Sequence, residues 1–243
     1  MRDRVYSEEQ AHIVDFAFSA EVTAVFPDMI RRSMPGYETI IPMTGLIAAR
    51  QLGLQGKGVD LGCSLGATTQ AILAQNPAPA VRVIGIDNSS PMIEGAVDAN
   101  LDNRATFVLM DILDADTDAY LVDADVIVLN FVLQFCEPSA RAALLKRIRS
   151  LMAPDGLVIL SEKVRDADPG THSFYDETHL AWKRANGYSE LEVNQKRTAL
   201  ENVMIVDTEA EHRSRLAEAG FHGVTQWYKC LNWASFIARP QPQ

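Results

Sequence analysis

Four polar residues between positions 60 and 130 have the types and spacing of a site that holds a ligand through hydrogen bonds. Asp60 opens the stretch "DLGCSLG", and Asp87, Asp111 and Asn130 each end a later run of mostly apolar residues. A carboxylate about 20 residues after a glycine-rich turn is placed to accept hydrogen bonds from ribose hydroxyls. For each residue taken alone, the alternative is that it only forms a turn after a strand, where Asp and Asn are favoured. Four such residues in succession favour a binding site.

The stretch "DLGCSLG" places Gly62 and Gly66 around a predicted turn between a strand and a helix. Glycine there lets the backbone approach a ligand where a side chain would block it. A tight turn without a ligand is the alternative, because short motifs also occur by chance. A nicotinamide dinucleotide would need the spacing G-x-G-x-x-G, and Ser64 stands in place of the second glycine, so the turn disfavours a pyrophosphate.

The elements that must position these residues alternate between apolar strands and helices, as in a parallel sheet covered on both faces. The apolar runs predict strands over 57–62, 81–89, 105–112, 124–135 and 157–164. Helical periodicity predicts helices over 67–76, 90–101, 137–156 and 208–221. Ser90 is the expected N-cap of the second of these helices, with Pro91 at its first position. Two runs at 223–231 and 234–240 predict a final antiparallel hairpin.

Two segments lie outside this alternation and are expected to cover the site. Residues 1–55 precede the first strand, and residues from about 165 to 207 separate the fifth strand from the last helix. Open α/β sheets bind ligands at the carboxyl ends of their strands, within reach of a segment inserted after the fifth strand. We expect residues 1–243 to form a single domain with these two caps.

Composition narrows the classes of function. The 243 residues carry a net charge of −10, which argues against direct nucleic-acid binding because that needs many cationic contacts. The three cysteines show neither a CxxC pair nor Cys/His ligand spacing, so no disulfide framework or metal site is predicted and a reducing cytoplasm fits. No apolar run approaches the roughly 18 residues of a membrane helix, and the N-terminus lacks the apolar stretch of a signal peptide.

The D-x-G-x-x-x-G spacing and the closing hairpin together resemble the class I S-adenosylmethionine (SAM) dependent methyltransferases, whose Rossmann-like fold carries a mostly parallel seven-stranded sheet. Ser64 departs from the usual loop of that superfamily, which commonly has glycine there. A narrower resemblance, over about residues 14–238, is to the carboxy-S-adenosyl-L-methionine synthases, bacterial enzymes of wobble-uridine tRNA modification. The stretches that carry it are "VFPDMIRRSMPGY", "DLGCSLGA", "IDNSSPMI", "VLNFVLQF" and "KRANGYSELEVNQKRTALENVM".

The narrower resemblance implies a reaction and a set of contacts. SAM and prephenate would give carboxy-SAM and phenylpyruvate, in a homodimer that binds neither nucleic acid nor membrane. Arg197 would hold the added carboxylate and be the catalytic residue. The residues expected to bind SAM are Tyr37, Gly62, Cys63, Ser64, Asp87, Asn88, Asp111, Ile112 and Asn130.

A cation such as Arg197 is expected to interact favourably with the carboxylate of the product but unfavourably with SAM. Two unit charges 4 Å apart repel by about 4 kcal/mol at an effective dielectric near 20, so a guanidinium beside the sulfonium of SAM is unfavourable. Once a carboxylate is attached, the planar guanidinium can bind it through two parallel hydrogen bonds. A solvated helix-face charge beside Lys196 is the alternative.

Other residues of the second cap have weaker claims to a role. Lys183 and Arg184 are secondary anion candidates, and His172 or His179 is a conceivable general base, with a satisfied polar histidine as the alternative. Trp182 and Tyr188 are candidates for the pocket wall. Cys63 is expected to be a small loop residue and no nucleophile. The proton acceptor for the SAM methyl is not identified by the sequence, and a group derived from prephenate is one candidate.

Two other functions remain open at this point. An ordinary SAM-dependent small-molecule methyltransferase would form S-adenosylhomocysteine and need no prephenate. A regulatory SAM-binding subunit would bind the nucleoside without turnover and need a protein partner.

Overall fold

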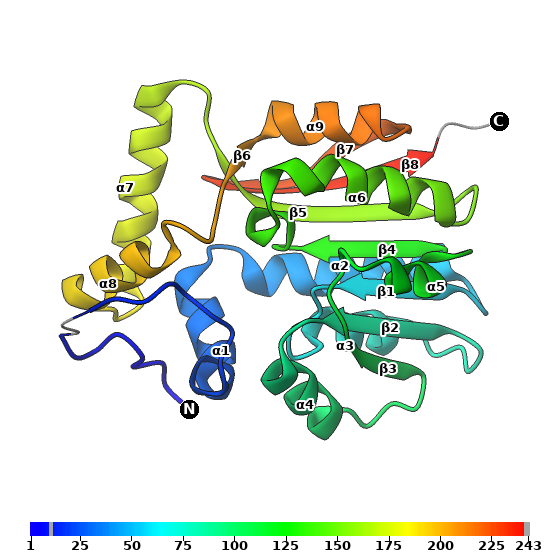
Figure 1. The fold of residues 1–243 in the computed structure, drawn as a ribbon, viewed down its shortest axis with the longest axis horizontal. Coiled ribbons are helices and arrows are strands. Elements are labelled where there is room, and N and C mark those ends of the chain that lie inside the picture. Colours follow the sequence, from blue (N-terminus) through cyan, green and yellow to red (C-terminus); the bar gives the residue numbers. More distant parts are fainter. Residues whose placement is uncertain (10–11, 241–243) are drawn as a thin grey trace.

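The computed structural model describes residues 1–9 and 12–240, and its centre is one eight-stranded sheet (Figure 1). Strands β1 to β5 are parallel, and β8 runs antiparallel to both β5 and β7. The order across the sheet is β3-β2-β1-β4-β5-β8-β7, with β6 beside β5. The strands span Lys57–Leu61 (β1), Arg82–Asp87 (β2), Ala105–Leu109 (β3), Val126–Asn130 (β4), Leu157–Arg165 (β5), Asp207–Thr208 (β6), Phe221–Cys230 (β7) and Trp233–Pro240 (β8). The predicted parallel sheet with a terminal antiparallel hairpin is confirmed.

Helices cover both faces of this sheet. Their bounds are Ala20–Ser33 (α1), Tyr37–Leu52 (α2), Ala67–Gln75 (α3), Ser90–Ala99 (α4), Asp118–Leu121 (α5), Pro138–Leu151 (α6), Pro169–Ala185 (α7), Glu190–Leu200 (α8) and Glu209–Glu218 (α9). Short 3₁₀ turns, η1 and η2, span Ala115–Thr117 and Leu133–Phe135. Side chains of α2 and α3 pack on one face, while α5, α6 and α9 pack on the other.

Strand β4 shows why the sheet needs both layers. All its residues are buried, and successive side chains of a strand point to opposite faces. Ile127 and Leu129 therefore pack in the cluster with α6, whereas Val126 and Val128 pack in the cluster with α2 and α3. A continuous apolar run is the pattern expected for a strand covered on both faces.

The N-cap prediction for α4 was wrong by one residue. Ser89 is the N-cap: its backbone is extended, and its Oγ accepts a hydrogen bond from the Met92 N–H at 3.4 Å. Ser90 is already the first helical residue, so its hydroxyl instead donates to the Glu94 carboxylate at 2.8 Å. Pro91 lies in the first turn as predicted.

The predicted fourth strand, over 124–135, was too long at its carboxyl end. The strand stops at Asn130, and Phe131 takes a left-handed φ of 65°, which turns the chain out of the sheet. The buried Glu162 carboxylate stabilises this exit, because its Oε1 accepts the N–H groups of Val132 and Leu133 at 3.0 and 2.7 Å. This turn brings η2 over the strand ends.

Helices α7 and α8 lie at the carboxyl ends of the parallel strands, together with α1 and the N-terminal segment (Figure 1, left). Several long-range hydrogen bonds hold them there. His179 Nε2 lies 2.7 Å from the Ser33 carbonyl, and Arg32 Nε donates to the Asn186 carbonyl at 2.8 Å. Helix α2 packs instead on the sheet, so only part of the segment 1–55 lies over the strand ends.

Candidate active site

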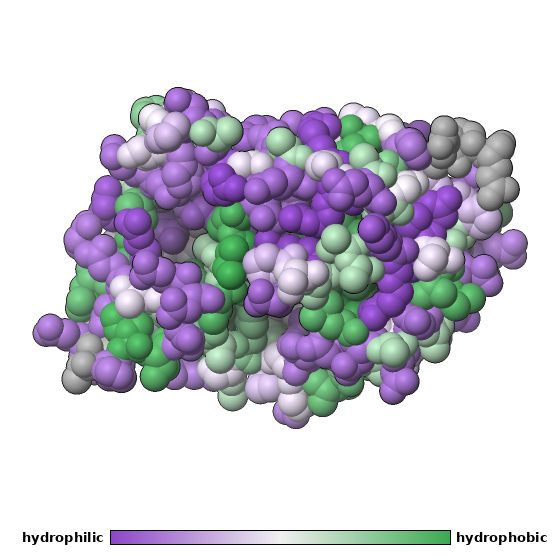
Figure 2. All heavy atoms as spheres, turned by 45° about the horizontal axis from the view of Figure 1, so that its top comes forward, coloured by the Kyte–Doolittle hydropathy of each residue, from purple (hydrophilic) through white to green (hydrophobic). Residues whose placement is uncertain are grey.

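The carboxyl ends of the strands and the helices above them enclose a cavity of about 660 Å³. This volume is in the range of small-molecule binding pockets. Figure 2 shows hydrophobic residues gathered around a hollow between the α7–α8 side and the body of the molecule. Nine of the ten predicted binding residues line the cavity: Tyr37, Gly62, Cys63, Ser64, Asp87, Asn88, Asp111, Ile112 and Asn130. The tenth, Arg197, does not line it and is exposed on α8.

The loop after β1 takes the strained backbone that its glycines suggested. Gly62, Ser64 and Gly66 all have positive φ, of 70°, 50° and 76°. A Cβ at Gly62 would lie 2.5 Å from a methyl group of Val132, so no larger residue fits there without movement. Ser64 adopts the left-handed conformation that glycine takes at no steric cost. Its backbone thus keeps the loop's shape although the glycine of the common pattern is absent.

Asp60 supports this loop from beneath and does not line the cavity. It lies within β1 and is buried, and its Oδ2 accepts hydrogen bonds from the Thr69 N–H at 3.1 Å and from the Thr69 hydroxyl at 2.8 Å. Burial raises the pKa of Asp60 to about 7, opposed by the two hydrogen bonds from Thr69. The residue therefore fastens the first turn of α3 to the sheet.

Asp87 ends β2 and faces the same loop. Its Oδ2 accepts the Ser64 N–H and its Oδ1 accepts the Ser89 N–H, each at 2.9 Å. Burial raises the pKa of Asp87, while these backbone donors lower it. Each carboxylate oxygen retains a second lone pair. Asp87 can therefore position the loop and accept ribose hydroxyls at the same time.

Asn88 and Asp111 border the cavity beside Asp87. The Asn88 amide lies 3.4 Å from Asp111 Oδ2, and Asp111 Oδ1 accepts the Leu113 N–H at 2.8 Å. Ile112, which also lines the cavity, is buried and apolar. A polar rim next to an apolar surface suits the edge and the face of a nucleobase.

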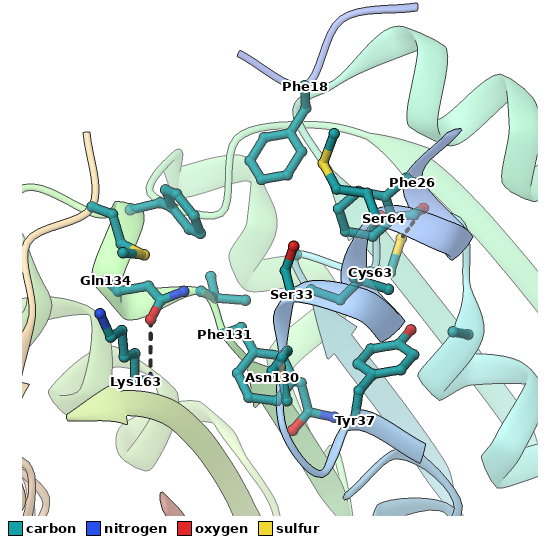
Figure 3. Close-up of a pocket in the computed structure, with 18 of the residues that line it drawn as sticks. Phe18, Phe26, Ser33, Tyr37, Cys63, Ser64, Asn130, Phe131, Gln134 and Lys163 are labelled. Carbon is teal, nitrogen blue, oxygen red and sulfur yellow. Dashed lines mark hydrogen bonds between the residues drawn. The ribbon is translucent and has the colours of Figure 1, made fainter. Parts of the chain in front are cut away.

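Asn130 offers an acceptor that the described residues leave unused. Its amide Nδ2 donates to the Thr68 hydroxyl at 3.1 Å, but its Oδ1 is buried without a hydrogen-bond partner among those residues. A buried carbonyl oxygen without a donor costs free energy, so this position fits a ligand that brings an N–H group. Figure 3 shows Asn130 beside Tyr37 at the base of the pocket.

Tyr37 and Cys63 are neutral wall residues. Burial raises the pKa of Tyr37 to about 12, and burial also raises the pKa of the Cys63 thiol. Both groups therefore stay protonated near neutral pH. A thiol in this state is a poor nucleophile, in agreement with the expectation for Cys63.

An aromatic cluster, which sequence reasoning missed, covers part of the cavity. Phe18 packs edge-to-face against Phe16, Phe26 and Phe135, with ring centroids 5.2 to 6.0 Å apart. All four rings line the cavity, and Figure 3 shows Phe18 and Phe26 at its upper side. The spacing of phenylalanines in "DFAFSAEVTAVF" was the available signal, because it concentrates aromatic residues in a segment expected to be a cap.

Three lysines from three elements line the cavity: Lys163 of β5, Lys183 of α7 and Lys196 of α8. We call them the lysine cluster. Sequence reasoning gave Lys183 a secondary role and missed the other two as binding residues. The helical spacing of Val193, Lys196 and Leu200 was the signal for Lys196, since these positions share one face.

Burial disfavours the charged forms of these lysines. It lowers the pKa of Lys183 to about 7, assisted by repulsion from Lys196 and Lys163. It also lowers the pKa of Lys196 to about 8. Lys163 shifts downward for the same reason, although attraction from Asp176 opposes the shift. The lining around these lysines is therefore rich in cations, and the carboxylates that act on them are Asp176 and, for Lys196, Asp3.

Of the remaining cap candidates, only His179 lines the cavity. Burial lowers its pKa to about 3, so the imidazole is neutral and its Nε2 donates to the Ser33 carbonyl. Arg184 is exposed and pairs with Glu190 at 3.2 Å, and Trp182 is also exposed. Tyr188 packs against the Arg32 guanidinium, 3.9 Å from its ring centroid, outside the cavity.

His172 lies 3.6 Å from Asp176 and does not line the cavity. Within residues 1–9 and 12–240 no cluster of His, Cys, Asp or Glu could hold a metal ion. In the same part of the chain no helix has the length and apolar character needed to cross a bilayer.

The family relationship follows from comparison with known proteins. A methyltransferase-domain family model matches residues 59–158, which contain most of β1, all of β2 to β4 and Asp87. The chain is 46% identical over 242 residues to a carboxy-S-adenosyl-L-methionine synthase of Pseudomonas aeruginosa, covering 98% of each protein. The chain belongs to the carboxy-S-adenosyl-L-methionine synthase family. A synthase of Aeromonas hydrophila is likewise 46% identical, over 98% of this chain and 95% of the relative.

Solved structures place the fold of this synthase-family chain among the SAM-dependent methyltransferases. An O-methyltransferase family protein from Burkholderia thailandensis superposes with a TM-score of 0.68 at 16% identity, covering 92% of this chain and 60% of the other. Human N-acetylserotonin methyltransferase in complex with SAM superposes with a TM-score of 0.61 at 16% identity, covering 92% and 56%. The predicted class I Rossmann-like methyltransferase fold is confirmed, and the chain is an enzyme of that SAM-dependent superfamily.

Proposed function

We propose that this enzyme transfers a carboxyl group from prephenate to the methyl carbon of SAM, which gives carboxy-SAM and phenylpyruvate. The observation that carries the proposal is the 46% identity, over nearly the whole of both chains, to relatives named carboxy-S-adenosyl-L-methionine synthase. The cavity supports it, because nine residues expected to contact SAM and the three residues of the lysine cluster line the same cavity.

The proposed reaction balances without a further reactant. Prephenate loses its ring carboxylate as carbon dioxide and its ring hydroxyl as hydroxide, and the ring becomes aromatic in phenylpyruvate. The hydroxide takes a proton from the SAM methyl and becomes water. The sulfonium ylide that remains uses its carbon electron pair to attack carbon dioxide, so the new C–C bond carries a carboxylate.

The chain's own residues would hold the reactants and exclude water. The aromatic cluster around Phe18 covers the cavity with apolar surface, which favours a reaction between an ylide and carbon dioxide over loss of either to solvent. Asp87 would hold the ribose, and Asn130 Oδ1 has room for an N–H donor from the ligand. Neither Tyr37 nor Cys63 needs to ionise in this scheme.

Arg197 remains our proposed receptor for the added carboxylate. Its exposed position on α8 means that its side chain must turn inward, or that a second copy of the chain must present it in the predicted homodimer. Its positive charge already lowers the pKa of Lys163 and Lys183, after burial as the main cause, so it acts on that part of the cavity lining. A light-scattering measurement of molar mass in solution tests whether the chain forms the predicted homodimer.

The product would supply wobble-uridine modification of tRNA carried out by another enzyme. A net charge of −10 supports a small-molecule role over direct tRNA binding. The place of action is proposed to be the cytoplasm.

Mass spectrometry of the ligand released from freshly purified enzyme tests the proposal. Protein from cells that make prephenate is expected to carry carboxy-SAM, heavier than SAM by one carbon dioxide unit. Release of only SAM or S-adenosylhomocysteine from such cells would instead favour an ordinary methyltransferase.

A further inference from the structure

The lysine cluster gives the cavity a second binding end with its own chemistry. Its members come from β5, α7 and α8, and all three line the cavity. Lys183 and Lys196 are 8% and 7% exposed, and the side chain of Lys163 is 16% exposed. Buried ammonium groups are rare unless they are paired. Which anions the cluster can bind therefore depends on how many of its charges the protein itself already neutralises.

The described residues supply few counter-ions. Lys183 has no hydrogen bond or ion pair from its ammonium group among residues 1–9 and 12–240. Lys196 Nζ donates to the Ser33 hydroxyl at 3.0 Å, which is neutral. Lys163 Nζ lies 3.5 Å from Asp176 Oδ1, the one carboxylate in direct contact with an ammonium group of the cluster among the described residues. That carboxylate is shared, since His172 and Asn232 also contact it. The buried Asp3 acts on Lys196 without such a contact, and its charge raises the pKa of Lys196 against the effect of burial.

The position of the cluster follows from the order of the strands. Asp111 follows β3, Asp87 ends β2, Ser64 follows β1 and Asn130 ends β4. These are neighbouring strands in the sheet, so the four residues run across one edge. Lys163 lies on β5, the next strand after β4. Figure 3 accordingly places Lys163 and Cys63 on opposite sides of the pocket.

We propose that Lys163, Lys183 and Lys196 form the subsite that binds the carboxylates of the acid that donates the carboxyl group. The inference rests on the proposed function for the reaction, and it adds which residues of this chain recognise the acid. An acid with two carboxylates matches a cluster of three ammonium groups that has one carboxylate, Asp176, in direct contact. Charge-assisted hydrogen bonds to ammonium groups would fix its orientation.

SAM itself is the other anion source, because it carries a carboxylate on its methionine part. Its sulfonium and ammonium groups are cations, however, and the lysine cluster repels cations. Asp87, at the end of β2, and the unpartnered oxygen of Asn130 offer acceptors to SAM. We therefore assign the lysine cluster to the acid, and we make SAM binding a separate arm of the test.

The subsite has a consequence for pH. Lys183 faces Lys163, Lys196, Asp176 and Arg197, and burial with repulsion from the other lysines lowers its pKa to about 7 in the free enzyme. A bound carboxylate favours the charged form. Affinity for the acid is therefore expected to fall as pH rises from 7 to 9, and binding near pH 8 is expected to take up protons.

Calorimetry with S-adenosylhomocysteine-loaded enzyme tests the assignment without turnover, because that nucleoside has no methyl group to carboxylate. Prephenate and malonate are the two probes, and the variants are Lys183→Met and Lys196→Met, which keep an apolar stem without the charge. Lys146→Met, on the exposed side of α6, is the matched control.

Each cluster variant is expected to weaken prephenate binding about 10- to 150-fold, the range for a lost hydrogen bond to a charged group. Affinity for S-adenosylhomocysteine and for SAM is expected to stay within about 3-fold, well below that range, and this also shows that the variants are folded. The control is expected to match wild type for all ligands. The pH dependence of prephenate binding is expected to flatten in Lys183→Met.

Unchanged prephenate affinity in both folded variants would overturn the assignment. Equal losses for SAM and prephenate would also overturn it, and would give the lysines to the methionine carboxylate. If prephenate does not bind wild type but malonate does, and the lysine variants lose malonate, the proposed substrate is wrong and the subsite stands. If neither acid binds wild type, the subsite is wrong. Should one variant fail to fold, the other variant and the wild-type pH profile decide.

Discussion

Asp87 and Ser64 are joined by a hydrogen bond of 2.9 Å between the carboxylate Oδ2 and the backbone N–H. The bond links the end of β2 to the loop after β1, at a residue whose φ of 50° is unfavourable for any side chain. Asp87 therefore stabilises the loop that must approach the ligand. The same carboxylate is the proposed acceptor for the ribose hydroxyls, so Asp87 both holds the loop in place and contacts the ligand in the proposed site.

Substitution of Asp87 by alanine is expected to weaken SAM binding by about 1.5 to 3 kcal/mol, the range for hydrogen bonds to a charged group. Titration calorimetry measures this, and Asp98→Ala on the exposed face of α4 is the control. An unchanged affinity in a folded Asp87→Ala protein would remove Asp87 from the SAM site.

Gly62 is expected to be intolerant of alanine for two separable reasons. Its φ is 70°, and a Cβ there would lie 2.5 Å from Val132. Gly53 has a φ of 57° with nothing within 4 Å of its Cβ position, so Gly53→Ala measures the backbone strain alone. The backbone of Gly53, at φ 57° and ψ −134°, lies in a region that side chains rarely adopt, so we expect Gly53→Ala to lower the free energy of unfolding by about 1 to 3 kcal/mol. Gly62→Ala is expected to lose about 1 to 3 kcal/mol more, from overpacking.

Urea unfolding of both variants checks this pair. A similar loss of unfolding free energy in both variants would mean that the loop moves away from Val132 to admit the new methyl group. The close packing at Gly62 would then not restrict which residue can stand there. Loss of SAM affinity is expected only in Gly62→Ala, since Gly53 ends α2 away from the cavity.

Removal of Lys183 is expected to stabilise the ligand-free enzyme. Burial, with repulsion from Lys196 and Lys163, lowers its pKa from 10.5 to about 7, so between these values the unfolded chain binds a proton that the folded chain does not. The contribution of Lys183 is thus most favourable above about pH 10.5 and is lost as pH falls toward 7. Lys183→Met at pH 7 is expected to gain about 1 to 3 kcal/mol in the free energy of unfolding, because a buried unpaired charge is gone.

Urea unfolding of wild type, Lys183→Met and Lys146→Met at pH 7, 8 and 9 tests this prediction. The difference between Lys183→Met and wild type should shrink as pH rises, while Lys146→Met should show no such trend. A loss of stability in Lys183→Met at pH 7 would mean that its ammonium group has a compensating partner after all.

Arg197 is tested by paired affinities for SAM and carboxy-SAM. Arg197→Lys keeps the charge but loses the planar fork, so it is expected to bind carboxy-SAM less tightly and SAM nearly as well. Arg197→Ala is expected to go further. If Arg197 is only a solvated charge on α8, both variants should stay within about 1 kcal/mol of wild type for both ligands.

The sequence was sufficient for the SAM side of the site because that side depends on local order. Asp87, Asp111 and Asn130 follow strands whose apolar runs are plain in the sequence, and neighbouring parallel strands end at one edge. The hairpin of β7 and β8 was predicted from the sequence in the same way. The end of β4 was misplaced because the turn at Phe131 depends on Glu162, which is distant in the sequence.

The other side of the cavity depends on tertiary packing of the cap, which local patterns do not specify. Lys196 and Arg197 are adjacent in sequence, yet successive residues of a helix point in different directions, and it is Lys196 that faces the cavity. Lys163 lies near the carboxyl end of β5 and became a cavity residue only because α7 and α8 lie over the strand ends. The aromatic cluster needed the same packing.

The origin of the transferred carbon tests the central claim most directly. Purified enzyme is incubated with SAM and prephenate that carries ¹³C in its ring carboxylate, with unlabelled bicarbonate in the buffer, and the nucleoside products are analysed by mass spectrometry. The proposed reaction predicts carboxy-SAM that retains the ¹³C label, together with unlabelled phenylpyruvate in equal amount. Formation of S-adenosylhomocysteine without carboxy-SAM, or of carboxy-SAM without the label, would contradict carboxyl transfer from prephenate.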